Sequence, residues 1–199
     1  MNNLLLLWKE VLRSPRSLGT IAPSSKWLAQ DLVEAADLRR ETVTVEIGAG
    51  TGPLTEWIIS EVEPLHFIAL EPNDSLADRL RERFPGIDVS EKPATNLREA
   101  LEERGYTHAD RVLCSLPWSL FSENEINDSL DAVCDVLGEN GTFLTLVYTH
   151  AKYLPSSRML RDSLMKYFYK VEFTGTTWRN LPPGQWLVCR NPIRERRKE

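Results

Sequence analysis

The feature that most constrains the fold of this sequence is the alternation of short β-rich runs with helical patterns from Thr42 onward. Apolar and β-branched residues concentrate in five runs, at residues 43–47, 65–70, 87–89, 111–114 and 142–148. Between them, apolar residues recur every three or four positions at 54–62, 75–84, 95–104 and 125–137. Strands that alternate with crossover helices are typical of a parallel sheet built from βαβ units.

The last part of the chain predicts a change of strand direction. A helix at about 156–167 is followed by two β-rich runs, 169–177 and 185–190, which the turn-forming residues 180–184 join. These runs predict an antiparallel hairpin at one edge of the sheet. A chain of 199 residues with 42% hydrophobic residues can bury one substantial core. We therefore expect a single-domain, Rossmann-like α/β fold with a mostly parallel seven-stranded sheet and a C-terminal antiparallel hairpin.

Two helices are expected before the sheet. On a helical wheel one arc is apolar and the opposite side carries Lys9, Glu10 and Arg13; the apolar positions are Leu4, Leu5, Leu7, Trp8, Val11 and Leu12. Pro15 should end this amphipathic helix, and Ser24 or Ser25 can cap a second helix that runs to about Ala36. We thus divide the chain into N-terminal helices, 1–36, and a main domain, 37–199.

Charge and cysteine content narrow the choice of compartment and partner. The formal charge is −5, but residues 1–30 and 190–199 each carry +3, so the middle carries −11. An acidic body disfavours a broad nucleic-acid footprint, whereas basic ends are attracted to anionic lipid, unless they only keep the ends solvated. Three widely spaced cysteines indicate neither disulfides nor a zinc site, and no metal is expected. The apolar run at the N-terminus is too short for a secretory signal or a membrane span, so we expect a cytoplasmic protein.

A glycine-rich loop is the most informative motif. The first β-rich run ends in Glu46-Ile-Gly-Ala-Gly-Thr-Gly52, and a helix begins directly after Pro53. Glycines let the backbone approach a ligand closely, and the free N–H groups at a helix start favour polar or anionic ligand groups. Glu71 ends the next run nineteen positions after Gly52, where a carboxylate can accept hydrogen bonds from both ribose hydroxyls. This pattern predicts a site for an adenosine-containing cofactor.

The Glu-x-Gly-x-Gly-x-Gly loop with Glu71 resembles the class I methyltransferases, which use S-adenosylmethionine (SAM) and release S-adenosylhomocysteine. The resemblance implies that Glu46 lies near the methionine ammonium and that Glu71 holds the ribose. It further implies cofactor contacts from Gly48, Ala49, Gly50, Gly52, Pro72 and Ala94. Many members have Gly-Asp-Ala after the third strand, but this chain has Lys92-Pro93-Ala94 and so lacks the carboxylate that contacts adenine in those members.

The fourth strand leads into Ser115-Leu-Pro-Trp118, which resembles the Asn-Pro-Pro-Tyr and Asn-Leu-Pro-Tyr loops of amino-group methyltransferases. In those loops a polar side chain orients the acceptor amine and an aromatic ring stacks on it. Ser115 is expected to contact both cofactor and acceptor, although a hydroxyl lacks the donor and acceptor pattern of an amide. Trp118 is expected to face a cationic acceptor, and an ordinary core position is its alternative.

Three further segments resemble the short bacterial phospholipid N-methyltransferases. They are Gly19-Thr-Ile-Ala-Pro-Ser-Ser25, Tyr148, and Trp178-Arg-Asn-Leu-Pro-Pro183. The resemblance implies stepwise methylation of phosphatidylethanolamine to phosphatidylcholine. Arg179 and Asn180 would then bind the lipid phosphate, Tyr148 would face the amine, and Ser24 would contact cofactor as well as cap its helix.

A lipid acceptor gives the N-terminal helix a role at the inner face of the cytoplasmic membrane. The residues expected to contact lipid there are Leu4, Leu5, Trp8, Lys9, Val11, Leu12 and Arg13. Packing of the same arc on the body or on a second subunit is the alternative. His150 is a candidate base, although a loop histidine without that role explains it too, and His66 and His108 are expected to be structural.

Two other functions remain open from the sequence. Ser115-Leu-Pro-Trp118 also suits an adenine N6-methyltransferase that acts on rRNA or tRNA, although the acidic body opposes RNA binding. The third hypothesis is a module that binds SAM and membrane without turnover, which the departures at Ser115 and Pro93 motivate.

Overall fold

The computed structural model describes residues 25–194, and all structural statements below refer to them. The predicted amphipathic helix, with its lipid-contact residues, and Ser24 lie outside this range. The helices are α2 (Lys26–Ala36), α3 (Pro53–Val62), α4 (Asp74–Arg83), α5 (Leu97–Glu102), α6 (Glu123–Val136) and α7 (Pro155–Tyr167), with short 3₁₀ turns η1 (Ala94–Asn96), η2 (Trp118–Leu120) and η3 (Thr149–Ala151). The strands are β1 (Val43–Ile47), β2 (His66–Leu70), β3 (Asp88–Ser90), β4 (Ala109–Cys114), β5 (Leu137–Tyr148), β6 (Phe168–Phe173) and β7 (Gly184–Pro192).

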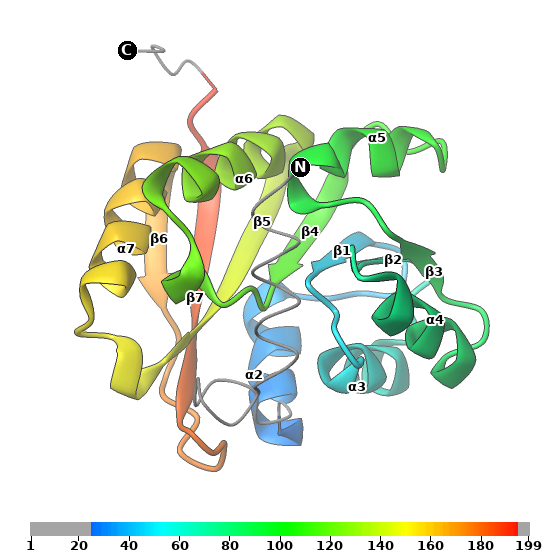
Figure 1. The fold of residues 1–199 in the computed structure, drawn as a ribbon, viewed down its shortest axis with the longest axis horizontal. Coiled ribbons are helices and arrows are strands. Elements are labelled where there is room, and N and C mark those ends of the chain that lie inside the picture. Colours follow the sequence, from blue (N-terminus) through cyan, green and yellow to red (C-terminus); the bar gives the residue numbers. More distant parts are fainter. Residues whose placement is uncertain (1–24, 195–199) are drawn as a thin grey trace.

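The strands form one seven-stranded sheet in the order β3-β2-β1-β4-β5-β7-β6 (Figure 1). Strands β1 to β5 pair in parallel, and β7 pairs antiparallel with both β5 and β6. The predicted fold class, a mostly parallel sheet that ends in an antiparallel hairpin, is confirmed. The hairpin does not simply extend the sheet, because β7 lies next to β5 and leaves β6 at the edge.

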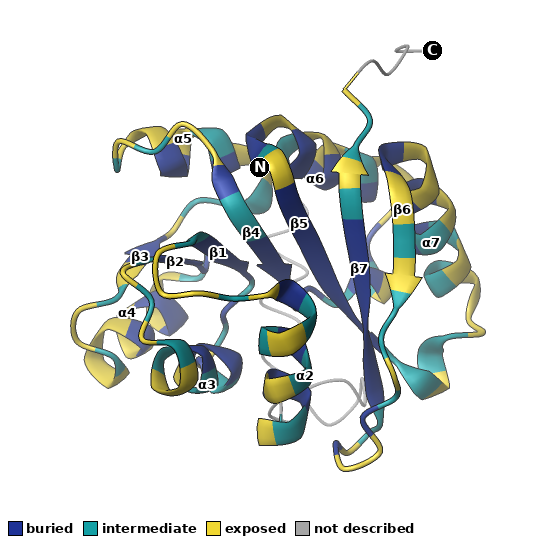
Figure 2. Ribbon diagram, turned by 180° about the vertical axis from the view of Figure 1, so that it is seen from behind, coloured by how far each residue is buried: buried dark blue, intermediate teal, exposed yellow. Residues whose placement is uncertain are grey.

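Helices cover both faces of the sheet and define two cores. Strand residues such as Ile47, Val112 and Phe143 face α5, α6 and α7. Alternate positions, among them Ala69, Leu113 and Leu144, face α2, α3 and α4. Figure 2 shows the central strands buried along almost their whole length, as expected for a sheet with two covered faces.

Local sequence signals explain where several helices begin. Ser122 and Glu125 form a reciprocal capping box at the start of α6. The Asn73 side chain accepts the Leu76 N–H at the start of α4, and Pro53 and Pro155 occupy first-turn positions of α3 and α7. These caps place each helix start at the carboxyl end of the preceding strand.

Helix α2 is fastened to the antiparallel part of the sheet. The Trp186 indole N–H donates to the Leu28 carbonyl at 2.9 Å, and Arg190 donates to the Ala35 carbonyl at 3.1 Å. Leu28 is fully buried between α2 and the sheet. The expected second helix, capped by Ser25 and ending at Ala36, therefore forms and packs on β5 and β7 (Figure 2).

The structure shortens two predicted elements. β6 ends at Phe173, and of the remaining predicted strand only Thr177 forms a bridge, to Gly184. The predicted helix 95–104 begins as the 3₁₀ turn η1 and continues as α5. No helix among residues 25–194 has the length and apolarity that crossing a bilayer requires.

We predict that Leu28→Ala destabilises the protein by about 2–5 kcal/mol, because it leaves a cavity between α2 and the sheet. Urea denaturation followed by circular dichroism measures this change, with the exposed Gln30→Ala on the same helix as the control. A loss below about 1 kcal/mol, the size of an ordinary surface substitution, would show that α2 is not a core element.

Candidate functional site

The predicted site residues gather at the carboxyl edge of the parallel strands. The chain runs from β1 outward to β3 and then crosses to β4 on the other side of β1. Open α/β sheets bind ligands at such a switch point, outside the carboxyl ends of the strands. The glycine loop follows β1, Glu71 follows β2, and Ser115 follows β4, so three sequence-distant motifs meet there.

The glycine loop has backbone torsions that favour glycine. Gly48, Gly50 and Gly52 have φ angles of 78°, 60° and 81°. A Cβ on Gly48 would lie 2.8 Å from Leu116, and one on Gly52 would lie 2.4 Å from Phe84, so these two glycines allow close packing. A Cβ on Gly50 would meet nothing within 4 Å. Gly50 is therefore the glycine of this loop that has open space beside it.

Glu71 closes this loop from the neighbouring strand. Its carboxylate accepts the Gly50 N–H at 2.9 Å through Oε2 and the Asn73 N–H at 3.0 Å through Oε1. The side chain is fully buried, and burial raises the pKa of Glu71 while these two hydrogen bonds lower it. A carboxylate has about four lone-pair sites, so roughly two remain for ligand hydroxyls.

Glu46 lies beneath the loop on the face that α3 covers. Thr55 donates its hydroxyl to Glu46 Oε2 at 2.6 Å, while Oε1 is buried without a partner among the described residues. Burial, with a smaller contribution from the negative charge of Glu71, raises the pKa of Glu46 to about 7. A buried carboxylate oxygen without a donor is suited to a cationic ligand group, because a cation would lower that pKa and supply the missing hydrogen bond.

Ser115 joins the loop after β4 to the glycine loop. Its hydroxyl donates to the Gly48 carbonyl at 3.0 Å, and its N–H donates to the Ile47 carbonyl at 3.2 Å. The hydroxyl oxygen keeps its lone pairs, so Ser115 can accept a hydrogen bond but has committed its proton.

Trp118, which the sequence analysis expected to face a cationic acceptor, is a buried residue. It is only 5% exposed, its indole N–H donates to the Thr145 hydroxyl at 2.6 Å, and its ring packs against Phe121 with centroids 5.4 Å apart. The indole satisfies its one donor inside the core, because Thr145 on β5 faces it. In this arrangement Trp118 has the core position that was its alternative.

Tyr148 stands at the end of β5, next to β4. Burial raises the pKa of Tyr148, so the phenol stays neutral at physiological pH. Its ring stacks on His150 at 5.8 Å between centroids, and His150 itself is exposed. His66 and His108, expected to be structural, lie at the opposite strand ends, where His66 hydrogen-bonds Tyr106 at 3.0 Å.

Arg179 and Asn180 lie in the loop between β6 and β7, and they have different environments. Asn180 is 1% exposed; its side chain accepts the Ser25 N–H at 2.9 Å and donates to the Pro182 carbonyl at 2.7 Å. The carbonyl and the amino group of the amide thus each make one hydrogen bond within the protein, and the phosphate contact expected from the sequence stays a prediction. Arg179 is exposed, with its guanidinium 5.6 Å from the centre of the Trp27 ring.

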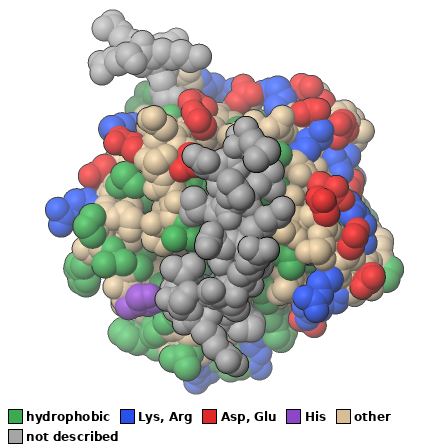
Figure 3. Space-filling model, in the orientation of Figure 1, with side chains coloured by type: hydrophobic (Ala, Val, Ile, Leu, Met, Phe, Trp, Pro, Cys, Tyr) green, Lys and Arg blue, Asp and Glu red, His purple; other side chains and the backbone are tan. Residues whose placement is uncertain are grey.

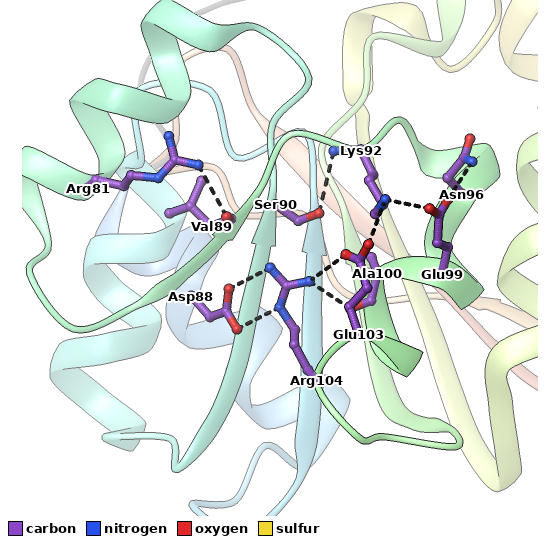
Figure 4. A network of polar contacts seen from close by, with 10 residues as sticks. All are labelled: Arg81, Asp88, Val89, Ser90, Lys92, Asn96, Glu99, Ala100, Glu103 and Arg104. Atoms are coloured by element: carbon purple, nitrogen blue, oxygen red, sulfur yellow. Dashed lines mark hydrogen bonds and ion pairs between the residues drawn. The ribbon is translucent and has the colours of Figure 1, made fainter.

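The segment Lys92-Pro93-Ala94, which departs from the family pattern, follows β3. Lys92 pairs with Glu99 at 2.7 Å and Glu103 at 3.1 Å, within the network of Figure 4. The lysine is therefore held toward α5. Pro93 and Ala94, which begin η1, remain at the carboxyl edge without a carboxylate.

Two residues of this site were missed by the sequence analysis. Thr55 is completely buried and holds Glu46, and its signal was a hydroxyl on the apolar face of a predicted helix. Asn73 caps α4 with its side chain and binds Glu71 with its N–H, and its signal was an asparagine directly before a helical pattern. Within residues 25–194, no group of His, Cys, Asp and Glu is arranged to hold a metal, and the three cysteines are buried.

Comparison with known proteins gives a relative of nearly the same length. Over 194 residues the chain is 33% identical to the ornithine lipid N-methyltransferase of Singulisphaera acidiphila. This match covers 96% of this chain and 97% of that protein. It is 34% identical over 100 residues to the ribosomal RNA small subunit methyltransferase A of Thermotoga neapolitana, but that match spans 49% of this chain and 38% of that protein. No family model matches the sequence.

Among solved structures, magnesium protoporphyrin IX methyltransferase from Synechocystis PCC 6803 with bound SAM superposes with a TM-score of 0.61. The superposition covers 83% of this chain and 79% of that chain at 11% identity. At that identity the likeness establishes the fold alone, which agrees with the strand order described above.

We predict that the stability of the ligand-free protein falls as pH rises from about 5 to 8. The pKa of Glu46 is about 7 in the folded protein and 4.5 in a model peptide, so folding favours the protonated form. This contribution is complete below pH 4.5, is lost as pH rises through 7, and amounts to about 3 kcal/mol.

Urea denaturation of the wild type and of Glu46→Gln, followed across this pH range, measures the effect. Gln stays neutral, so the variant should lose most of this slope and gain stability relative to the wild type at pH 8. The exposed Glu61→Gln on α3 is the control and should keep the wild-type slope. Equal slopes in Glu46→Gln and the wild type would contradict the assignment.

Proposed function

The chain belongs to the family of short bacterial lipid N-methyltransferases within the class I SAM-dependent methyltransferases, and from that premise we propose that it methylates the amine of phosphatidylethanolamine. The coarser activity, SAM-dependent methyl transfer, follows from the family. The lipid acceptor, its stepwise methylation toward phosphatidylcholine, and the roles of individual site residues are the proposal.

The residues at the carboxyl edge fit the cofactor. When bound, SAM supplies an electrophilic methyl group on a positively charged sulfur. Gly50 leaves space beside the loop, the buried Glu46 Oε1 has no hydrogen-bond donor, and Glu71 has lone pairs free at the end of β2. We assign Glu46 to the methionine ammonium, Glu71 to the ribose hydroxyls, and Gly48, Ala49, Pro72 and Ala94 to the surrounding wall.

The acceptor must reach the site as a neutral amine. A primary alkylamine has a pKa of about 10.4, so only about one molecule in a thousand is neutral near pH 7.5 in water. Partial burial lowers the pKa of an ammonium, and Ser115 and Tyr148 offer oxygen atoms that can accept amine N–H bonds and orient the nitrogen lone pair. Tyr148 stays neutral, because burial raises its pKa, and so it does not stabilise the ammonium as a phenolate would.

Arg179 supports a lipid with an anionic headgroup. Its guanidinium is exposed at the same edge as Tyr148, and the Thr149 N–H donates to the Pro183 carbonyl at 2.8 Å, which holds the two loops together. A guanidinium can bind a phosphate through two parallel hydrogen bonds. We assign Arg179 to the lipid phosphate and Asn180 to fastening the loop that presents it.

The membrane location is part of the same proposal. The amphipathic segment with Leu4, Trp8 and Lys9 would hold the protein at the inner face of the cytoplasmic membrane, where the lipid amine is available. These residues lie outside the described range, so their role rests on the sequence pattern.

The decisive experiment incubates the full chain with methyl-labelled SAM and vesicles that contain both phosphatidylethanolamine and ornithine lipid, and then separates the lipids. We expect label in mono-, di- and trimethylated phosphatidylethanolamine. Arg179→Ala should raise the KM for this lipid about tenfold or more, since the loss of a charged hydrogen bond costs about 1.5–3 kcal/mol. Arg40→Ala, at the opposite strand ends, is the control. Label in ornithine lipid alone would overturn the phosphatidylethanolamine assignment.

A second candidate is methylation of adenine in RNA, which the partial match to ribosomal RNA methyltransferases favours. Against it, the described residues carry 18 basic and 26 acidic side chains. Binding to RNA depends on neutralising phosphates with Lys and Arg over a broad surface. Label transferred to rRNA in place of lipid, with salt-dependent RNA binding, would establish this function instead.

We also predict that Gly50→Ala weakens SAM binding at least about tenfold in calorimetry, because a methyl group would occupy the ligand's space. A non-glycine residue at φ 60° costs about 1–2 kcal/mol of stability besides. Gly105→Ala is a matched control, since Gly105 has φ 77° and open space around its Cβ far from the site. The control should lose similar stability and bind SAM normally; equal affinity in Gly50→Ala would remove Gly50 from the cofactor site.

A further inference from the structure

The carboxyl edge that carries the site also exposes large apolar side chains. Among the described residues, Tyr153 is 84% exposed, Leu154 46%, Trp178 74% and Leu181 83%. We call these four residues the apolar rim. The other exposed large apolar residues, Leu65, Met165 and Tyr169, lie toward the amino ends of the parallel strands.

The two halves of the apolar rim belong to adjacent loops. Tyr153 and Leu154 follow β5 and η3, while Trp178 and Leu181 lie between β6 and β7. The loops touch where the Thr149 N–H donates to the Pro183 carbonyl at 2.8 Å, and Lys152 lies 4.7 Å from the centre of the ring of Phe173 at the end of β6. In Figure 3 hydrophobic side chains gather at the lower left, in the region that η3 and the start of α7 occupy in Figure 1.

In the β6–β7 loop, polar side chains point into the protein and make hydrogen bonds there, while large apolar side chains point outward. Thr177 is 6% exposed and donates its hydroxyl to Asp31 of α2, and the Asn180 side chain hydrogen-bonds Ser25 and Pro182. Trp178 and Leu181 stand beside these anchors and face solvent. Surface loops ordinarily do the reverse, and an exposed apolar patch on a fastened loop indicates an interaction surface.

The charge around the apolar rim is mainly positive, although the Asp31 carboxylate, which accepts the Thr177 hydroxyl, and Asp162 border it. The three segments that meet there, 25–30, 149–161 and 174–183, contain no Asp or Glu and five basic residues: Lys26, Lys152, Arg158, Arg161 and Arg179. The other described residues carry 13 basic and 26 acidic side chains. None of the five forms an ion pair within residues 25–194, whereas most other lysines and arginines there do.

We propose that the apolar rim and its five basic neighbours are a membrane-docking surface, which inserts Tyr153, Leu154, Trp178 and Leu181 at the headgroup level of an anionic bilayer. Trp and Tyr favour that depth, and unpaired Lys and Arg are attracted to the lipid phosphates. The inference rests on the proposed lipid acceptor, because docking by this edge turns the mouth of the site toward the headgroups. The excess of basic over acidic side chains in and beside the three segments favours an anionic lipid surface over a protein partner with mixed charge.

The apolar part is tested with Tyr153→Ser/Leu154→Ser/Trp178→Ser/Leu181→Ser in the full chain. Vesicles of phosphatidylcholine and phosphatidylglycerol, without SAM or phosphatidylethanolamine, isolate docking from substrate binding. We expect the apparent Kd from co-sedimentation to rise at least about tenfold, since binding scales with inserted apolar area. The matched control, Leu65→Ser/Met165→Ser/Tyr169→Ser, should bind as the wild type does. An unchanged Kd in the rim variant, or an equal loss in the control, overturns the proposal.

The electrostatic part has its own matched pair. Lys152→Glu/Arg158→Glu should weaken binding to phosphatidylglycerol vesicles several-fold and leave binding to pure phosphatidylcholine vesicles unchanged. Lys166→Glu/Lys170→Glu changes the net charge equally but lies near the amino ends of the strands, and it should have a smaller effect. Equal losses in the two variants would show that net charge, and not this surface, governs binding.

A third measurement separates this proposal from the proposed function. Detergent-dispersed phosphatidylethanolamine does not require docking, so the rim variant should methylate it, bind SAM and unfold thermally as the wild type does. Transfer lost in detergent as well as on vesicles would place the rim residues in the active site and overturn the docking role. If the wild type methylates no dispersed lipid, the proposed function fails, while the vesicle comparison still decides the docking surface.

Discussion

The arrangement of the whole carboxyl edge depends on one buried carboxylate, that of Glu71. It accepts one N–H from the glycine loop after β1 and one from the residue that caps α4. Since both partners are backbone groups, the contact sets the positions of two chain segments relative to each other. The glycine loop in turn receives the Ser115 hydroxyl at its Gly48 carbonyl, which brings in β4. The segments that follow β1, β2 and β4 are thereby joined into one wall of the candidate site.

The electrostatics of this wall suit a cation. Glu46 and Glu71 are both buried, burial raises the pKa of each, and the charge of Glu71 raises that of Glu46 further. Folding thus places two carboxylates where neither is fully solvated, at a cost that a positively charged ligand would reduce. The SAM-dependent family to which the chain belongs uses such a ligand.

The surface around the site contrasts with its interior. The body of the protein is acidic, yet the loops after β5 and β6 have basic and apolar side chains and no carboxylate. The hydrogen bonds of Thr177 and Asn180 hold the β6–β7 loop, and with it this surface, in a fixed position relative to α2. An apolar surface on a loop that is already ordered loses little conformational entropy when it contacts a partner. More of the free energy gained by burying its side chains therefore contributes to binding. The proposed lipid substrate and the proposed docking surface share this one edge.

Local pattern in the sequence determined the strand runs, the crossover helices and the glycine loop, and it placed Glu46 and Glu71 at the ends of neighbouring strands. It could do so because periodicity, caps and glycine torsions are properties of short segments. Only the tertiary structure decided which long-range partner each polar group found. The Trp118 indole N–H donates to the Thr145 hydroxyl, and the Asn180 side chain accepts the Ser25 N–H. In both cases a donor or acceptor was buried by sheet packing and took a partner from a distant segment. No local pattern specifies that choice, since it depends on which elements the fold brings together.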